Sequence, residues 1–191
     1  VDTVRTNNSA VVEELTPALL NLGDIQKVLQ NLLRERVSIR DLTTILETLA
    51  DHARATKDTD HLTEQVRQAL FRSITKAHLS PDNAIHAVTL DPRLEQVLIG
   101  AVHRGEGGAF LALEPRMAQK VITALSRQIE TLSRQGYAPL ILCSPAVRLY
   151  FKRLIEKLLP NLTVLSYNEL DPKTEIQSSG AVTVGDENTA V

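Results

Sequence analysis

The chain has 191 residues, a formal net charge of -2 and only 3% aromatic residues, so its core must be mainly aliphatic. This length allows one large or two small domains that bury about 70% of the unfolded surface. The weak charge argues against a general nucleic-acid or anionic-membrane binder, the single Cys143 excludes an intrachain disulfide, and no apolar run approaches the ~18 residues that span a bilayer.

Residues 1–79 predict an all-helical unit, because apolar residues recur there at helical spacing. The clearest stripe consists of Ile25, Val28, Leu29, Leu32 and Leu33. The expected helices cover residues 11–22 with a bend near Pro17, 25–34, 42–53, and 62–77 after a cap at Asp58 or Asp60. The sequence begins at Val1 rather than Met, and we expect it to be a segment of a longer protein.

The junction between the second and third of these helices predicts a capping box. The Ser38 hydroxyl is expected to accept from the backbone N–H of Asp41, and the Asp41 carboxylate to reach back toward the N–H of Ser38. Val37 and Leu42 flank this pair as a hydrophobic staple. Removing the Ser38 hydroxyl is therefore expected to cost ~1 kcal/mol of stability.

Residues 84–184 predict an α/β unit, separated from the helices by the turn cluster at 80–83. Strands are expected at 84–90, 109–113, 140–143, 163–167 and 176–184, and helices at 92–103, 115–135 and 145–158. The run 140–167 reads as a βαβ unit, which predicts parallel strands in an open, Rossmann-like sheet with 176–184 at its edge. The fold class is therefore α+β overall, and 185–191 is expected to be a disordered polar tail.

Cys143 and Ser144 lie where an α/β sheet often places a nucleophile, at the carboxyl end of a strand that enters a helix. Pro145 at the first helical position instead favours Ser144 as a helix cap, and no G-x-S-x-G elbow surrounds it. A small-molecule-binding or hydrolytic domain that uses Ser144 stays open as the alternative function. The glycine-rich run 105–108 lacks the Lys-Ser/Thr of a phosphate loop and is interpreted as a mobile connector.

The remaining polar residues give no sign of a metal, cofactor or nucleic-acid site. The histidines lack the spacing of zinc motifs. A DNA-reading helix-turn-helix at 25–53 is disfavoured, because its second helix would turn Glu47 and Asp51 toward phosphates. We therefore expect no metal, no cofactor and no nucleic-acid partner.

Five charged residues surround the junction of the two best-defined helices: Arg34, Glu35, Arg36, Arg40 and Asp41. One interpretation is a set of solvated helix ends. The other is a subunit contact, because mixed-sign charge on a rigid corner suits a head-to-tail interface in which one patch meets a different patch.

Four blocks of sequence are long enough to compare with known families. They are VLQNLLRERVSIRDLTTILETLAD at 28–51, LTEQVRQAL at 62–70, LILCSPAVR at 140–148 and VLSYNEL at 164–170. In this order they closely resemble the FHIPEP family of export gates, which serves flagellar and type III secretion systems. The resemblance covers nearly the whole chain.

The resemblance implies a place within a larger protein, where a multi-pass membrane portion precedes a cytoplasmic region of several subdomains. Residues 1–79 would be the third subdomain and 84–184 the fourth, at the cytoplasmic face of the bacterial inner membrane and without membrane contact of their own. Family members form nonameric rings, receive chaperone–substrate complexes and order their export. They are not enzymes, since energy comes from a separate ATPase and the proton gradient.

The resemblance also implies which surfaces act. Helices of the third subdomain commonly face the neighbouring protomer, so Arg34, Glu35, Arg36, Arg40 and Asp41 are the expected subunit-interface residues. The fourth subdomain is expected to meet the stalk protein of the ATPase complex or a neighbour. Chaperones dock mainly on earlier subdomains, so no chaperone-contacting residue is assigned, and the wording of the helical blocks favours the flagellar branch over the virulence branch.

Overall fold

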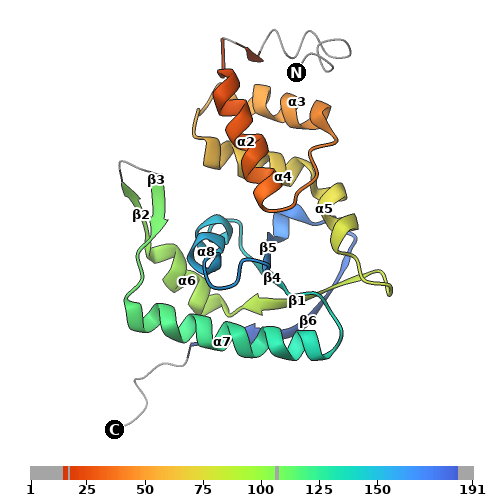
Figure 1. The fold of residues 1–191 in the computed structure, drawn as a ribbon, viewed down its shortest axis with the longest axis vertical. Coiled ribbons are helices and arrows are strands. Elements are labelled where there is room, and N and C mark those ends of the chain that lie inside the picture. Colours follow the sequence, from red (N-terminus) through yellow and green to blue (C-terminus); the bar gives the residue numbers. More distant parts are fainter. Residues whose placement is uncertain (1–14, 17, 106–107, 185–191) are drawn as a thin grey trace. The chain divides into compact units, whose positions relative to one another are not determined.

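The computed structural model describes residues 15–16, 18–105 and 108–184, and the chain divides into two units (Figure 1). The helical unit is Val1–His78 with Glu169–Asp171, and the α/β unit is Leu79–Asn168 with Pro172–Val191. The predicted fold class is confirmed, since in the described part of the chain helices precede a mostly parallel sheet with its own helices. Glu169–Asp171 lies with the helices, although the sequence prediction assigned it to the α/β unit.

The helical unit contains α2 (Leu22–Arg34), α3 (Leu42–Ala53), α4 (Thr59–Ala69) and α5 (Phe71–His78). Helix α2 begins before the predicted residue 25, because Asn21 and Asp24 cap it reciprocally. The N–H of Asp24 donates to Asn21 Oδ1 at 2.9 Å, and the N–H of Asn21 donates to Asp24 Oδ2 at 3.2 Å. The predicted helix over 11–22 falls mostly outside the described residues.

The apolar stripes form the core of this unit as the helical spacing predicted. The buried set comprises Ile25, Val28, Leu32, Ile45, Leu46, Leu49, Leu62, Val66 and Leu70. Two residues of the α2 stripe differ from this pattern, since Leu29 is only half-buried and Leu33 is 53% exposed. Position 33 lies at the margin of the α2 stripe, one residue beyond fully buried Leu32.

The single helix predicted over 62–77 is two helices, which meet at Leu70. Leu70 caps α4 with φ -84° and ψ 14°, outside helical geometry. Both Leu70 and Ile74 remain buried, so the apolar spacing continues across the break. Neither proline nor glycine marks this point, which explains why the sequence pattern did not reveal it. Of the two predicted caps for α4, Asp58 is the one used, accepting from the N–H of Asp60 at 2.9 Å.

The predicted capping box at Ser38 and Asp41 is wrong, because α3 begins only at Leu42. Asp41 is itself the N-cap and accepts from the backbone N–H of Thr44 at 3.1 Å and from its hydroxyl at 2.8 Å. Ser38 lies upstream of the helix and accepts from the N–H of Arg40 at 3.4 Å.

Asp41→Ala should therefore lower the free energy of unfolding by ~1 kcal/mol, whereas Ser38→Ala should leave it nearly unchanged. Asp41→Ala leaves the backbone N–H of Thr44, in the first turn of α3, without its acceptor. Ser38→Ala leaves this hydrogen bond intact. Urea denaturation of both variants followed by circular dichroism makes the comparison. A larger loss for Ser38→Ala would restore the original assignment.

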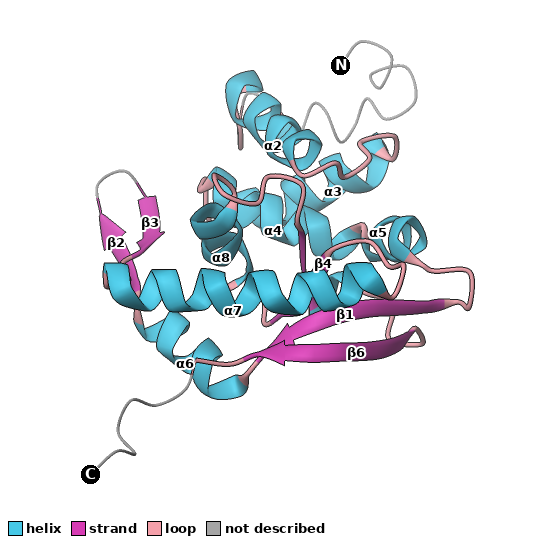
Figure 2. Cartoon of the chain, turned by 60° about the horizontal axis from the view of Figure 1, so that its bottom comes forward, coloured by secondary structure: helices cyan, strands magenta, loops and turns pink. Residues whose placement is uncertain are grey.

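The α/β unit is built on a four-stranded sheet of order β5-β4-β1-β6 (Figure 2). Its strands are β1 (Ala84–Leu90), β4 (Leu140–Cys143), β5 (Thr163–Ser166) and β6 (Glu175–Val182). Every neighbouring pair is parallel, which confirms the prediction from the βαβ unit, and β6 is an edge strand as expected. The 3-10 turn η1 (Tyr167–Glu169) follows β5.

Three helices, α6 (Pro92–Gly100), α7 (Pro115–Arg134) and α8 (Arg148–Ile155), share one core with the sheet. Asp91 and Pro92 start α6 as predicted, with the N–H of Arg93 donating to Asp91 Oδ1 at 2.9 Å. Helix α7 lies along β1 and β6 (Figure 2). Its end at Gly136, where φ is 89°, also matches the prediction.

The segment after α6 differs from the prediction. Helix α6 stops at Gly100 rather than near His103, and β2 (Val102–Gly105) pairs antiparallel with β3 (Gly108–Leu111) in a separate two-stranded sheet. In this short hairpin the backbone groups of the two strands hydrogen-bond each other. Residues 106–107, which belong to the predicted mobile connector, and the predicted tail at 185–191 lie outside the described residues.

Candidate functional site

The predicted interface residues lie in the α2–α3 corner, residues 34–41. Helix α2 ends there in a Schellman motif, in which the N–H of Arg36 donates to the carbonyl of Leu33 and the N–H of Val37 to the carbonyl of Leu32, both at 2.9 Å. Arg36 adopts the left-handed conformation that this motif requires, with φ 60°. Val37 and Leu32 are both buried, which supplies the apolar contact that accompanies the motif.

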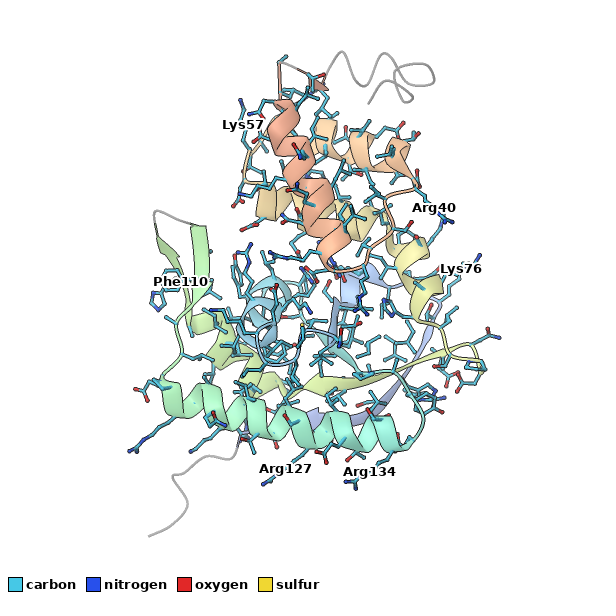
Figure 3. The ribbon with its side chains drawn as sticks, in the orientation of Figure 1. Arg40, Lys57, Lys76, Phe110, Arg127 and Arg134 are labelled. Atoms are coloured by element: carbon cyan, nitrogen blue, oxygen red, sulfur yellow. The ribbon has the colours of Figure 1, made fainter. Side chains whose placement is uncertain are left out.

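The five predicted residues do not all face outward. Arg34, Arg36 and Arg40 are exposed, and Figure 3 shows Arg40 pointing away from the helices. Asp41 is exposed but engaged in capping α3. Glu35 is turned inward, and its side chain is only 8% exposed. The corner therefore presents three arginines to solvent and keeps its glutamate inside.

A buried ion cluster, Glu35–Arg67–Glu169, explains the direction of Glu35. The guanidinium of Arg67 donates two hydrogen bonds to the carboxylate of Glu169, from Nε to Oε1 at 2.6 Å and from Nη2 to Oε2 at 3.0 Å. Its third nitrogen, Nη1, lies 3.3 Å from Oε2 of Glu35. The side chains of Arg67 and Glu169 are each 1% exposed. Two carboxylates thus share one guanidinium away from water, where removing one partner leaves an uncompensated charge.

The cluster continues a set of polar contacts between α2 and α4. One turn before Glu35, Asn31 Nδ2 donates to the hydroxyl of Thr63 at 3.1 Å. Thr63 in turn precedes Arg67 by one turn of α4, so the two contacts lie in register. Nearby, the N–H of Asp171 donates to the Thr75 hydroxyl at 2.8 Å, which fixes the Glu169–Asp171 segment on α5.

Sequence reasoning missed Arg67 and Glu169, which are 102 residues apart. Sequence patterns relate residues that are close along the chain, so they do not reveal a pair with this separation. One signal was available, because Arg67 falls on the apolar face of α4 beside Leu62, Val66 and Leu70, where a charge needs a partner. Glu169 gave no comparable signal.

His78, at the end of α5, interacts electrostatically with Arg67 and Glu169 of this cluster. Burial of its ring and the positive charge of Arg67 lower the pKa of His78 below its usual value of 6.5, while Glu169 opposes the shift. The unfolded chain therefore binds a proton that the folded unit resists, so this group favours folding fully above pH 6.5 and progressively less as pH falls below it.

The stability of the helical unit should therefore fall more steeply from pH 7.5 to 5.5 in the wild type than in His78→Gln. Thermal melts at a series of pH values measure this difference. His61→Gln, at an exposed histidine of α4, is the matched control and should keep the wild-type slope. Parallel pH profiles for wild type and His78→Gln would contradict the expectation.

The alternative site at Ser144 lacks the geometry of a nucleophile. Its backbone N–H donates to Glu95 Oε1 at 2.7 Å, so this carboxylate accepts from the backbone rather than from the hydroxyl. The Ser144 hydroxyl is buried and has no hydrogen-bond partner among the described residues. Nor does it cap a helix, since α8 begins at Arg148 and only the Ser144 carbonyl accepts from that N–H, at 3.1 Å. The predicted cap at Ser144 is therefore wrong.

The neighbourhood of Ser144 is that of a packed strand end. Cys143 is fully buried, with Sγ 3.6 Å from the carbonyl oxygen of Leu165. Burial, with lesser effects from Glu95 and Cys143, raises the pKa of Tyr167 above its usual value. A raised pKa keeps this phenol neutral, so it does not supply the base that Ser144 would need.

Within the described ranges, no group of three or more His, Cys, Asp or Glu side chains is placed to hold a metal ion. Among the same residues, none of the helices has the length and apolar character needed to cross a bilayer.

The comparison with protein families decides the relationship. A model described as the FHIPEP family matches residues 1–175. The chain belongs to the FHIPEP family. The flagellar biosynthesis protein FlhA of Bacillus subtilis is 43% identical over 184 residues, covering 96% of this chain and 27% of that protein. The chain spans about a quarter of the length of the curated relatives it matches.

Two solved structures share the fold of this chain. The Chlamydia pneumoniae CdsV chain, in a complex with CdsO, is 32% identical with a TM-score of 0.87, and the match covers 95% of this chain and 53% of that one. The nonameric EPEC SctV-C is 30% identical with a TM-score of 0.85, over 95% of this chain and 54% of that one.

Proposed function

We propose that this chain is an assembly and docking module in the cytoplasmic region of a flagellar export gate. The observation that carries the proposal is the match of nearly the whole chain to a domain that forms a nonamer. The FlhA relatives support the flagellar branch. In this role the chain contributes ring contacts and works without catalysis of its own.

The α2–α3 corner is the proposed contact with a neighbouring copy. Of its exposed cations, Arg34 ends α2, whereas Arg36 and Arg40 lie on the turn that follows. The backbone of this turn is fixed at both ends, by the Schellman motif of α2 and the Asp41 cap of α3. Rigid placement lowers the entropic cost of binding. Charges of one sign on such a turn favour a head-to-tail contact with a different, acidic patch.

Partner docking forms the second part of the proposal. The complex of CdsV with CdsO supports binding of a further export component by this type of domain. By family resemblance, that component would be the stalk protein of the ATPase complex. Chaperone–substrate complexes would be received by the larger protein, at its place on the cytoplasmic face of the inner membrane.

Arg40→Glu should weaken ring assembly at least about tenfold, because it reverses a charge at the proposed contact. The protein should be produced in its native cell, with rings captured by chemical cross-linking and export followed through secreted substrate in the medium. Lys57→Glu makes the same charge reversal at another exposed position of the helical unit and is the matched control (Figure 3).

Both variants should melt at the wild-type temperature, since neither side chain is buried. Assembly and export that are equal in Arg40→Glu and Lys57→Glu would remove the corner from the interface. A wild-type protein that shows no cross-linked rings would overturn the assembly function itself.

A further inference from the structure

Arg36 occupies a backbone position that favours glycine. Its φ of 60° is the left-handed conformation, in which a β-carbon crowds the backbone. Helix α7 ends in the same Schellman motif, with the N–H of Gly136 donating to Ser133 at 3.0 Å and that of Tyr137 to Leu132 at 3.3 Å. There the left-handed residue is Gly136, with φ 89°. The chain thus uses glycine where the motif ends α7 and arginine where it ends α2.

A strained residue persists only where its surroundings hold it, and such residues gather at functional sites. Both neighbours of Arg36 make buried contacts. Glu35, the preceding residue, forms an ion pair with buried Arg67, whose Nη1 lies 3.3 Å from Oε2 of Glu35 without a hydrogen bond, while Nε and Nη2 of Arg67 donate two hydrogen bonds to Glu169. Val37, the following residue, is buried and closes the motif onto Leu32.

We propose that Arg36 contacts a second copy of this chain and that buried Arg67 positions it by holding Glu35. This inference rests on the proposed assembly function and adds to it an internal positioning residue. The contact on the second copy is carboxylate in character, since arginine recognises carboxylates through paired bonds. Glu47 and Asp51, exposed on α3, are carboxylates of this kind on the same unit.

Arg36→Gly separates a contact role from a structural one. A structural role predicts only a gain, because glycine relieves the left-handed conformation, so the melting temperature should be equal or higher. A contact role predicts in addition about tenfold weaker ring assembly. Asn83→Gly is the matched control, because Asn83 also has φ 60° but lies in the α/β unit. It should match or exceed the wild-type melting temperature and assemble normally.

The positioning role of Arg67 needs a variant that folds without the ion cluster. Replacing the cluster by apolar residues, Glu35→Leu with Arg67→Met and Glu169→Leu, should retain stability, as such replacements often do. Arg36 is still present in this variant, but the ion cluster that contacts the preceding residue, Glu35, is gone. Assembly should therefore fall about tenfold at an unchanged melting temperature. Arg67→Lys, which keeps the charge and loses the two-pronged guanidinium, gives a second test if the triple variant does not fold.

The outcomes distinguish this inference from the assembly function. Rings lost in Arg40→Glu but normal in both Arg36→Gly and the apolar triple variant would leave the interface standing and overturn the inference. Normal rings in Arg36→Gly alone would overturn its contact, and normal rings in the triple variant alone would overturn the positioning by Arg67. Absence of rings in the wild type would instead overturn the proposed function.

Discussion

Replacing Arg67 by Met should lower the free energy of unfolding of the helical unit by about 3–5 kcal/mol. The carboxylates of Glu35 and Glu169 would then face each other with no guanidinium between them. Both are almost fully removed from water, with side chains 8% and 1% exposed. The cost is therefore that of buried charge rather than of one lost contact.

Hydrogen exchange of peptides from α2, α4 and α5, together with urea denaturation, measures this loss in the helical unit. Lys76→Met removes one positive charge from an exposed position of α5 and is the control (Figure 3). It should change the free energy of unfolding by at most about 0.5 kcal/mol. The apolar triple variant should recover most of what Arg67→Met loses, because it removes the stranded carboxylates as well. An Arg67→Met variant no less stable than Lys76→Met would show that the cluster does not support the fold.

The elements that could be predicted from sequence are those that local chemistry determines. Apolar spacing located the helices of the core, Asp91 with Pro92 marked the start of α6, and Gly136 marked the end of α7. Each of these signals acts within one or two turns of chain. The parallel sheet was predictable for a related reason, since a strand, a helix and a strand in short succession leave few topologies.

The errors arise where neighbouring residues offered two acceptable local solutions. Ser38 and Asp41 are both residue types that cap helices well, and the structure uses Asp41, with α3 starting directly after it. Leu70 has the propensity to continue a helix, yet its backbone leaves helical geometry and α4 ends there. In both cases the residue types at the boundary are compatible with either solution, so the sequence pattern does not choose between them.

The charged corner between α2 and α3 could be predicted from the sequence, but the internal contacts of this corner could not. Mixed charge between two amphipathic helices pointed to the corner, and the exposed arginines lie there. The inward turn of Glu35 depends on Arg67 and on Glu169, which only folding brings near. Long-range ion pairs produce no periodic pattern in a sequence. The charge of Arg67 on the core face of α4 was therefore the one available signal.

Phe151→Ala should destabilise the α/β unit by about 3–5 kcal/mol. Phe151 is the only phenylalanine among the fully buried residues that the structure describes, and it lies in the core shared by α8 and the sheet. Aliphatic side chains surround it, including Val147 and Ile155 one turn away on either side. Branched side chains on helices and strands cannot collapse far into the space of a lost ring, so the cavity term adds to the lost burial.

Phe110→Ala deletes the same ring from the β2–β3 hairpin, where Phe110 is 53% exposed (Figure 3). Its only ring contact among the described residues is a tilted one with His103, at 6.3 Å between centroids. The expected change is therefore within about 0.5 kcal/mol. Urea denaturation of the two variants, read through hydrogen exchange in β1 and β4, tests the pair. Because the chemical change is identical, the difference reports mainly on burial, and equal losses would mean that α8 does not pack on the sheet as the structure describes.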